Sequence, residues 1–361
     1  MSEAQAPIQA EVRNRVGQLT LNRPAGLNAL NVEMVRLLRE HLEAWEKDAE
    51  VLAVVLRASG EKAFCAGGDI RALYDSHFAG DGAYMAFFEE EYALDQYLYA
   101  YPKPVLALIN GLVLGGGMGL VQGASLRVIT DRSRMGMPET GIGYFPDTGG
   151  SYFLSHLPGE LGTYLGITGQ QVRAADALYT GLADWCLPSD TLEEFDRCLD
   201  GMSWNTHPRE ALRTLVSALA SNKLAGSELK ALRPAIDGHF AHDDIAAIFD
   251  SLAGERRPEF QDWAEETLNV MRTRSPLAMA VTLESLRRGR DMMLSDCFAM
   301  ELHLDSQWFD KGDFIEGVRA LIIDKDKTPR WNPPGIEGLD RQQVLAFYSD
   351  LEPAIGKIRT A

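Results

Sequence analysis

Apolar positions in the first half of the chain follow two different spacings. From Leu30 onward they recur every three or four residues, which predicts a helix whose buried face is formed by Leu30, Met34, Leu37, Leu38, His41, Leu42 and Trp45. Asn31 is placed to cap the start of this helix. The run Val51–Arg57 (VLAVVLR) is apolar throughout, as expected for a strand in a sheet that is covered on both faces.

The apolar runs return at Val105–Ile109 and Leu126–Ile129, and a helix is predicted to begin between them near Gly116. Strand–helix–strand units of this kind predict an α/β fold with right-handed crossovers. Closer to the N-terminus, Glu11–Asn22 is interpreted as two short strands around Gly17.

The strand pattern fades after about Pro188, and helical spacing takes its place. Helices are predicted over Leu192–Leu224, Gly226–Asp237, Asp243–Leu252, Glu259–Thr273, Pro276–Arg287, Ser295–Lys311 and Asp340–Leu351. We therefore divide the chain into a mixed core over residues 1–200 and a mainly helical region over residues 201–361.

The chain is acidic, with 35 basic and 52 acidic residues and a formal net charge of −17. Such a charge argues against nonspecific binding to nucleic acid or to an anionic membrane. A small polyanionic ligand is still compatible with it, because arginines and helix N-termini can hold phosphates locally. No stretch approaches the roughly 18 apolar residues that a spanning helix needs.

The cysteines and histidines form no pattern typical of a metal site. Four cysteines are far apart in the sequence, and seven histidines include no HxxxH or HExxH spacing. Unpaired cysteines favour a reducing compartment. The N-terminal residues resemble neither a signal peptide nor an arginine-rich transit peptide. The expectation from these features is a cytoplasmic protein without a metal.

The stretch Lys103–Phe153 carries the clearest candidate chemistry. Its glycines Gly115, Gly116 and Gly117 lie between a strand and a helix start, where free N–H groups favour negative charge. The spacing matches neither a dinucleotide fingerprint nor a phosphate loop. A tight turn without a ligand is an equally good interpretation of this motif alone.

The loop Ala63–Arg71 (AFCAGGDIR) is a second place where small residues expose the backbone between a strand and a helix. Two such loops could each give one N–H to the same thioester oxygen, forming an oxyanion hole. Taken alone, this loop is better interpreted as a solvent loop with Asp69 as a helix cap. Cys65 is interpreted as a small buried residue, since no histidine partner is apparent.

Three carboxylates are candidates for catalysis or binding. Glu139 lies among apolar residues in MPETGIG, and such surroundings raise the pKa of a carboxylate toward the range of a general acid or base. Asp147 follows a proline in FPDTGG, and Glu91 lies on a predicted helix. Each has an ordinary alternative: a surface turn for Glu139, a turn or cap residue for Asp147, and a solvated helix acid for Glu91.

The segments FCAGGDI, NGLVLGGGMGL and MPETGIGYFPDTGG resemble, in this order, the enoyl-CoA hydratase/isomerase (crotonase) superfamily. The similarity is continuous from about Ile8 to Leu187. Within the superfamily, FFEEEYALDQ, GYFPDTGGSYFLSHLPG and DFIEGVRALIIDKDKTPRW resemble the subgroup of 3-hydroxyisobutyryl-CoA hydrolases, which act in valine breakdown.

The resemblance implies a crotonase-like α/β spiral of repeated strand–strand–helix units with a mainly helical C-terminal region. It implies an acyl-CoA substrate whose thioester oxygen is held by the N–H groups of Gly68 and Gly116. Residue by residue, Glu139 matches the principal catalytic carboxylate, Asp147 the hydrolase's second acid, and Glu91 a substrate-contacting acid. No cofactor is implied, since CoA enters with the substrate, and the assembly state is left open between a monomer and a homo-oligomer.

One departure from the superfamily pattern bears on the reaction. Hydratases of this superfamily carry a glutamate three residues after the middle glycine of the turn, where this chain has Gly119. The resemblance therefore favours hydrolysis of a short branched 3-hydroxyacyl-CoA, with Glu139 and Asp147 as the two acids. An enoyl-CoA isomerase or hydratase is the alternative, and an acyl-CoA-binding protein without catalytic activity is a third.

Overall fold

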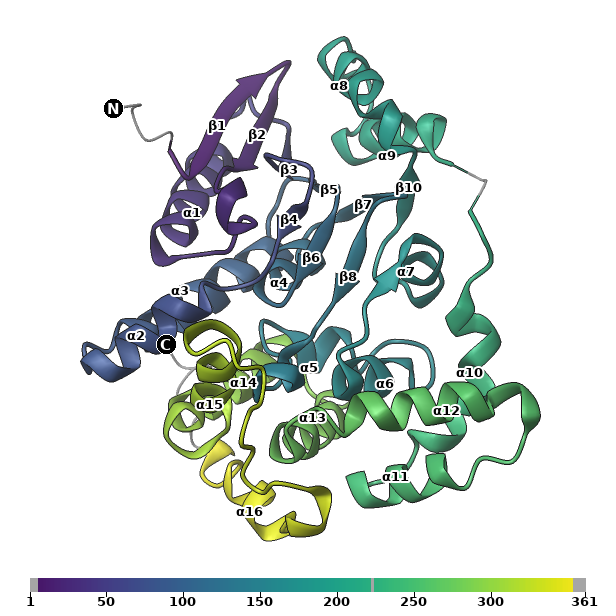
Figure 1. Cartoon of the computed structure of the whole chain (residues 1–361). Helices are drawn as coiled ribbons and strands as arrows, with labels where there is room; N and C mark the ends of the chain where they lie inside the picture. Colours follow the sequence, from purple (N-terminus) through teal and green to yellow (C-terminus); the bar gives the residue numbers. More distant parts are fainter. Residues whose placement is uncertain (1–5, 222–223, 353–361) are drawn as a thin grey trace. The chain divides into compact units, whose positions relative to one another are not determined.

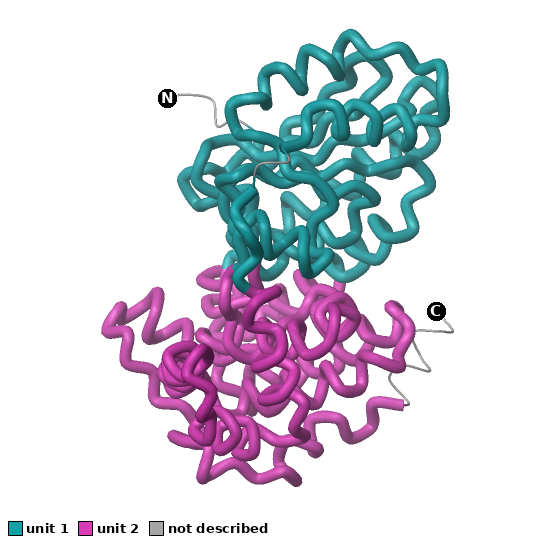
Figure 2. Tube along the Cα trace, turned by 90° about the vertical axis from the view of Figure 1, so that its right-hand side faces the viewer, with its two compact units in different colours: residues 1–69, 90–135, 172–228 teal, residues 70–89, 136–171, 229–361 magenta. Residues whose placement is uncertain are grey.

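The computed structural model describes residues 6–221 and 224–352. The chain forms two compact units, each assembled from three segments that are separate in the sequence (Figure 2). Unit 1 comprises residues 1–69, 90–135 and 172–228, and unit 2 comprises residues 70–89, 136–171 and 229–361. The division into a core ending at residue 200 and a helical region stays a prediction about the organisation of the sequence.

Unit 1 is built on a six-stranded sheet, which Figure 1 shows as a row of arrows. Its strands, in spatial order, are β1 (Ile8–Arg13), β2 (Val16–Leu21), β3 (Ala53–Ala58), β5 (Val105–Ile109), β7 (Leu126–Thr130) and β10 (Trp185–Leu187). The β1–β2 pair is antiparallel and all other pairs are parallel. The parallel sheet confirms the predicted α/β class.

The first hairpin differs from the expectation that Gly17 forms its turn. Asn14 and Arg15 make the turn with φ angles of 43° and 65°, and Arg13 pairs with Val16. Two successive positive φ angles are typical of the two-residue turns that match strand twist. Gly17 lies inside β2 instead, where an added Cβ would be 2.3 Å from the Trp45 ring, so that close packing explains the glycine.

Four short strands form a second sheet, in the order β4 (Ala63–Cys65), β6 (Leu112–Leu114), β8 (Arg134–Gly136) and β9 (Val172–Arg173). The β4–β6 pair is parallel, so the loops that follow these two strands leave the sheet from the same edge. Those loops are the two glycine-containing segments singled out in the sequence.

The helices of unit 1 pack against its two sheets. They are α1 (Val32–Lys47), α4 (Gly116–Gln122), α7 (Ala174–Thr180), α8 (Leu192–Asp200) and α9 (Pro208–Leu219), with short turns η1 (Pro24–Gly26) and η3 (Ser189–Thr191). The side chain of Asn31 accepts the Met34 N–H and caps α1, as predicted. Phe195, Leu199, Leu212 and Val216 of α8 and α9 pack with sheet residues in one apolar cluster.

The single helix predicted over Leu192–Leu224 is wrong. Gly201 ends α8 and Pro208 starts α9, so two helices are separated by a connection that a continuous helix cannot contain. Positions 222 and 223 of that prediction lie outside the described residues.

Unit 2 is helical in its described residues. It contains α2 (Ile70–Ala79), η2 (Glu139–Ile142), α5 (Gly150–Phe153), α6 (Leu161–Thr168), α10 (Glu228–His239), α11 (Ile245–Ala253), α12 (Pro258–Met271), α13 (Pro276–Gly289), α14 (Leu294–Lys311), α15 (Phe314–Val318), a π-helical turn η4 (Arg319–Ile323), η5 (Ile336–Gly338) and α16 (Arg341–Ala346). The helix α3 (Ala83–Tyr99) contributes residues to both units. These bounds confirm the predicted helical C-terminal region.

Candidate active site

In unit 1, the two glycine loops approach each other closely. Gly115 has φ 50° and ψ −124°, and Gly67 has φ 98°, conformations that residues with a Cβ rarely adopt. A Cβ added to Gly67 would lie 3.6 Å from the Gly116 nitrogen, and one added to Gly116 would lie 3.5 Å from the Gly68 nitrogen. The structure thus brings the Gly68 and Gly116 backbones together.

Glu91 of α3 joins this group. Its side chain is only 1% exposed, and its Oε1 would lie 2.3 Å from a Cβ at Gly116. The alternative of a solvated helix acid is therefore wrong for Glu91. Gly116 is also the first residue of α4, and N–H groups in the first turn of a helix have no partner inside that helix. The Glu91 carboxylate and the N-terminus of α4 thus lie at one turn.

Cys65, at the end of β4, behaves as expected for a buried residue. It is fully buried, and burial raises the pKa of its thiol to about 12, with the charge of Glu91 contributing. A thiol with such a pKa stays protonated at neutral pH and is a poor nucleophile.

In unit 2, Glu139 and Asp147 form a coupled pair. Both are buried, with exposures of 7% and 6%, so neither is a surface turn acid. Burial raises the pKa of Glu139 well above its usual value, and the nearby Asp147 charge raises it further. Glu139 Oε2 has no hydrogen-bond partner in residues 6–221 and 224–352. A buried carboxylate with a raised pKa suits proton transfer or attack on a carbonyl.

The backbone around Asp147 forms a tight turn that leads into α5. Thr148 and Gly149 have φ angles of 53° and 84°, and the Gly150 N–H donates to the Asp147 carbonyl over 2.7 Å. The turn gives Asp147 a fixed backbone position. The backbone of Asp147 therefore has the turn conformation that the sequence offered as an alternative. A turn does not by itself require Asp147 to be buried beside Glu139.

The helix α14 contributes three side chains around this loop that were not predicted from the sequence. Trp308 Nε1 donates to the Gly143 carbonyl over 2.8 Å, the Tyr144 hydroxyl donates to Asp305, and Glu301 accepts hydrogen bonds from Gly149 and Ser151. These α14 residues share one helix face because they are spaced by four and three positions. In the sequence, this role was indicated only by acids that fall on the apolar face of a predicted helix.

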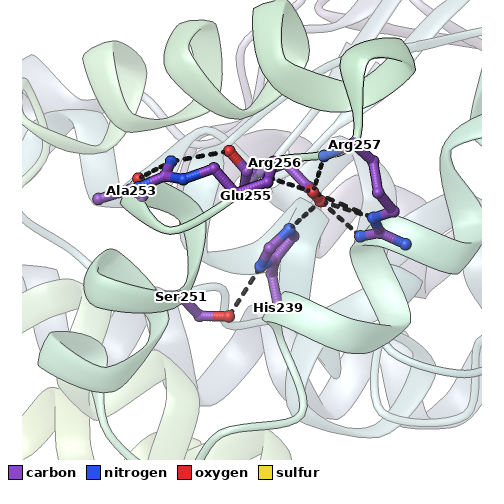
Figure 3. Close-up of polar contacts among 6 residues, drawn as sticks. All are labelled: His239, Ser251, Ala253, Glu255, Arg256 and Arg257. Carbon is purple, nitrogen blue, oxygen red and sulfur yellow. Dashed lines mark hydrogen bonds and ion pairs between the residues drawn. The ribbon is translucent and has the colours of Figure 1, made fainter.

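A second polar constellation in unit 2 connects α10, α11 and the start of α12 (Figure 3). Ser251 Oγ lies 2.8 Å from His239 Nδ1, and His239 Nε2 lies 2.9 Å from Glu255. Glu255 also accepts from the backbone and guanidinium of Arg257, which holds its pKa well below the usual range. Because Arg257 already neutralises this carboxylate, we interpret the constellation as a structural link between three helices.

The remaining chemical features of the described residues are simple. The four cysteines are free thiols. Over residues 6–221 and 224–352, no group of three or more His, Cys, Asp or Glu side chains could hold a metal ion. None of the helices in that part of the chain is long and apolar enough to cross a membrane.

Comparison with known proteins identifies the family. Residues 16–348 match the model of the enoyl-CoA hydratase/isomerase family. The chain belongs to this family. It is 36% identical to the mitochondrial 3-hydroxyisobutyryl-CoA hydrolase of Danio rerio, over 97% of this chain and 91% of that protein. The corresponding enzyme of Gallus gallus is also 36% identical, over 97% and 90%.

Solved structures agree with the family and its fold. A carnitinyl-CoA dehydratase from Mycobacterium thermoresistibile superposes with a TM-score of 0.87 at 36% identity, covering 95% of this chain and 96% of that one. An enoyl-CoA hydratase from Rhodobacter sphaeroides gives 0.85 at 36% identity, covering 96% and 98%. These matches confirm the crotonase-like α/β architecture.

One expectation is contradicted by the relatives. Both hydrolases are named as mitochondrial, whereas the sequence features had indicated a cytoplasmic protein. The cysteine argument was sound only for a reducing environment, which is not unique to the cytoplasm. The composition of a few N-terminal residues was too weak a basis for choosing between such compartments.

Proposed function

We propose that this protein hydrolyses 3-hydroxyisobutyryl-CoA to 3-hydroxyisobutyrate and CoA, a step of valine breakdown. The main support is its similarity over nearly its whole length to hydrolases named for this substrate. The buried pair Glu139 and Asp147 supports the same reaction, because hydrolysis needs groups that activate water and move a proton. CoA enters as part of the substrate, and the reaction requires no further cofactor.

The glycine loops of unit 1 supply the electrophilic part of this mechanism. The N–H groups of Gly68 and Gly116 donate to the thioester oxygen as negative charge develops on it, and each such donor contributes a factor of roughly 100 to 1000 in rate. Glu91 accepts a hydrogen bond from the 3-hydroxyl group of the substrate. The proximity of its carboxylate to Gly116 supports this role.

Glu139 and Asp147 supply the acid–base part. Glu139 either attacks the carbonyl carbon or removes a proton from the water that attacks it, and Asp147 positions this water or passes the proton. The new C–O bond forms first and gives a tetrahedral oxyanion, and its collapse breaks the C–S bond so that the electron pair leaves with sulfur as the CoA thiolate. If Glu139 is the nucleophile, water then hydrolyses the resulting anhydride and releases the hydroxy acid. After one turnover in ¹⁸O-labelled water, label in the Glu139 carboxylate indicates covalent attack, because only an anhydride of Glu139 lets water oxygen enter that carboxyl group.

Hydration of an enoyl-CoA is the second candidate function, because the two similar solved structures are named as a carnitinyl-CoA dehydratase and an enoyl-CoA hydratase. Water addition in this superfamily uses two acids, one of them at the position of Gly119. Gly119 lies buried in α4 and provides no acid. The second acid of this chain is Asp147, which favours hydrolysis.

A thiol-release assay separates the two functions. Purified protein is mixed with 3-hydroxyisobutyryl-CoA, other 3-hydroxyacyl-CoA esters and crotonyl-CoA, while free thiol and enoyl absorbance are recorded together. Cys198 is exposed, so a protein-only blank corrects for its reaction with the thiol reagent. We expect thiol release from 3-hydroxyisobutyryl-CoA. A change in enoyl absorbance without thiol from any 3-hydroxy ester would overturn the proposal.

A further inference from the structure

Glu301 of α14 is a buried acid with a specific set of partners in the loop that carries Asp147. Its Oε2 accepts the Gly149 N–H over 2.7 Å, and its Oε1 accepts the Ser151 N–H over 2.8 Å and the Ser151 hydroxyl over 2.5 Å. The side chain is completely buried. The Glu301 side chain therefore binds two backbone N–H groups, those of Gly149 and Ser151, in the turn that starts immediately after Asp147.

Charge as well as geometry connects Glu301 with the acid pair. Burial raises the pKa of Glu301 to about 8, hydrogen bonds from Ser151 and Gly149 oppose this rise, and the Asp147 charge adds to it. The Asp147 charge likewise raises the pKa of Glu139. Three buried carboxyls are thus coupled through Asp147, and ionising all three at once is unfavourable.

The other titratable neighbour of Glu301 is Cys297, one turn earlier in α14. Burial, and then the Glu301 charge, raise the pKa of this thiol to about 12, so it remains neutral over the pH range of interest. The remaining donors, Gly149 and Ser151, carry no charge.

We propose that Glu301 is a positioning residue of the catalytic loop, which fixes the turn that follows Asp147 through its hydrogen bonds with Gly149 and Ser151. This inference rests on the proposed function for its kinetic consequences. Through this turn, α14 of the helical C-terminal part affects the position of the reacting groups. Glu301 itself is assigned no contact with the substrate.

The first test compares Glu301→Gln with Glu301→Asp. The glutamine keeps the size but places an NH2 group, which cannot accept a hydrogen bond, against one backbone N–H. The aspartate keeps an ionisable carboxyl group but is one methylene shorter. In both variants we expect kcat to fall roughly ten- to hundredfold, because small displacements of a catalytic group have effects of that order, while KM changes less than about twofold.

The pH dependence distinguishes the two variants. Burial raises the pKa of Glu301 to about 8, and its ionised form is the better acceptor for the donors of the turn, so we expect wild-type kcat to rise as the pH passes through about 8. Glu301→Gln cannot ionise and loses this rise, whereas Glu301→Asp keeps an ionisable carboxyl group and retains it. Glu284→Gln is the matched control, since Glu284 is a unit 2 acid paired with Arg288 over 2.7 Å, and we expect no change in either quantity.

A second measurement does not depend on activity. ¹³C NMR of protein labelled at the glutamate carboxyl carbon follows the ionisation of Glu301, whose signal is assigned by its loss in Glu301→Gln, or in Glu301→Asp if the glutamine variant does not fold. We expect the titration midpoint of Glu301 to rise in Ser151→Ala, because losing the hydroxyl donor makes the Glu301 carboxyl group harder to ionise.

The outcomes separate this inference from the proposed function. Wild-type protein that releases no CoA overturns the proposed hydrolysis, and the NMR midpoint still tests Glu301. Wild-type hydrolysis together with wild-type kcat in Glu301→Gln overturns the inference alone. An unchanged Glu301 midpoint in Ser151→Ala also overturns it, since the hydroxyl would then not bind the carboxyl group.

Discussion

Substituting Gly116 by alanine tests the assignment of the glycine turn most directly. A Cβ at this position would lie 2.3 Å from Glu91 Oε1 and 3.3 Å from the carboxyl carbon. The Gly116 φ angle lies outside the left-handed region, so alanine can adopt the backbone conformation. The perturbation is therefore the new contact with Glu91 rather than strain in the main chain.

The size of the effect follows from that distance. Carbon and oxygen atoms in ordinary contact are about 3.5 Å apart, so the Glu91 carboxylate and the turn must separate by about 1 Å. A displacement of that size near reacting groups reduces the rate by about 100-fold. We expect kcat/KM for 3-hydroxyisobutyryl-CoA to fall about 100-fold, which is about 2.7 kcal/mol of transition-state stabilisation. Overpacking should also lower the free energy of unfolding by about 1–3 kcal/mol.

The assay is thiol release under initial-rate conditions, with thermal unfolding measured in parallel. Gly123→Ala is the matched control, because it lies at the other end of α4 and its Cβ would press on the same helix α3, 2.8 Å from Leu98 Cβ. It should lower stability by a similar amount while keeping kcat/KM within a few-fold of wild type.

The two variants together separate catalysis from stability. Wild-type kcat/KM in Gly116→Ala, with the melting temperature lowered as in Gly123→Ala, would refute the assignment of this turn to substrate activation. Equal kinetic losses in both variants would show that α4 affects the rate only through packing.

Three further changes test other parts of the structure. Because the pKa of Glu139 is raised and its ionised form is needed, kcat/KM should decline below an apparent pKa well above 4.5. An acid limb at the ordinary glutamate pKa would contradict this assignment. Glu139→Gln should lose at least about 1000-fold in kcat. Glu255→Gln should lower the free energy of unfolding at pH 7 by about 2 kcal/mol with kcat unchanged. Folding lowers the pKa of Glu255, so its contribution to the free energy of unfolding is complete above about pH 4.3 and is lost as the pH falls through the lower pKa of the folded state. In urea unfolding, the difference between variant and wild type should therefore be smaller at pH 3 than at pH 7. Gly17→Ala places a Cβ 2.3 Å from the Trp45 ring and should destabilise the protein by about 1–3 kcal/mol without changing kcat, whereas an unchanged melting temperature would mean that Trp45 repacks freely.

Local sequence patterns predicted the secondary structure where neighbouring residues control it. The apolar run Val105–Ile109 coincides with β5, and Asn31 caps the start of α1 as predicted. The first hairpin was misjudged because Asn14 and Arg15 accept positive φ angles, while Gly17 is required by its contact with Trp45, which is 28 positions away. A glycine alone does not indicate whether backbone conformation or close packing requires it.

The candidate site was predictable to the extent that its residues lie in recognisable motifs. Gly68, Glu91 and Gly116 come together in unit 1, and Glu139 and Asp147 come together in unit 2. Their chemical roles remain predictions that the experiments above address. Glu301 was not found, because it lies about 150 positions from the turn that it holds and belongs to no motif.

Apolar periodicity and motif spacing are local properties of the chain, so they were enough to predict the fold class, most of the longer helices and the family. The burial of Glu91 and Glu139 and the contact of α14 with the Asp147 turn became apparent only in the folded structure. Desolvation and charge coupling depend on every group that packs around a carboxylate. Those groups come from distant segments, so the pKa values that bear on the chemistry are properties of the folded chain.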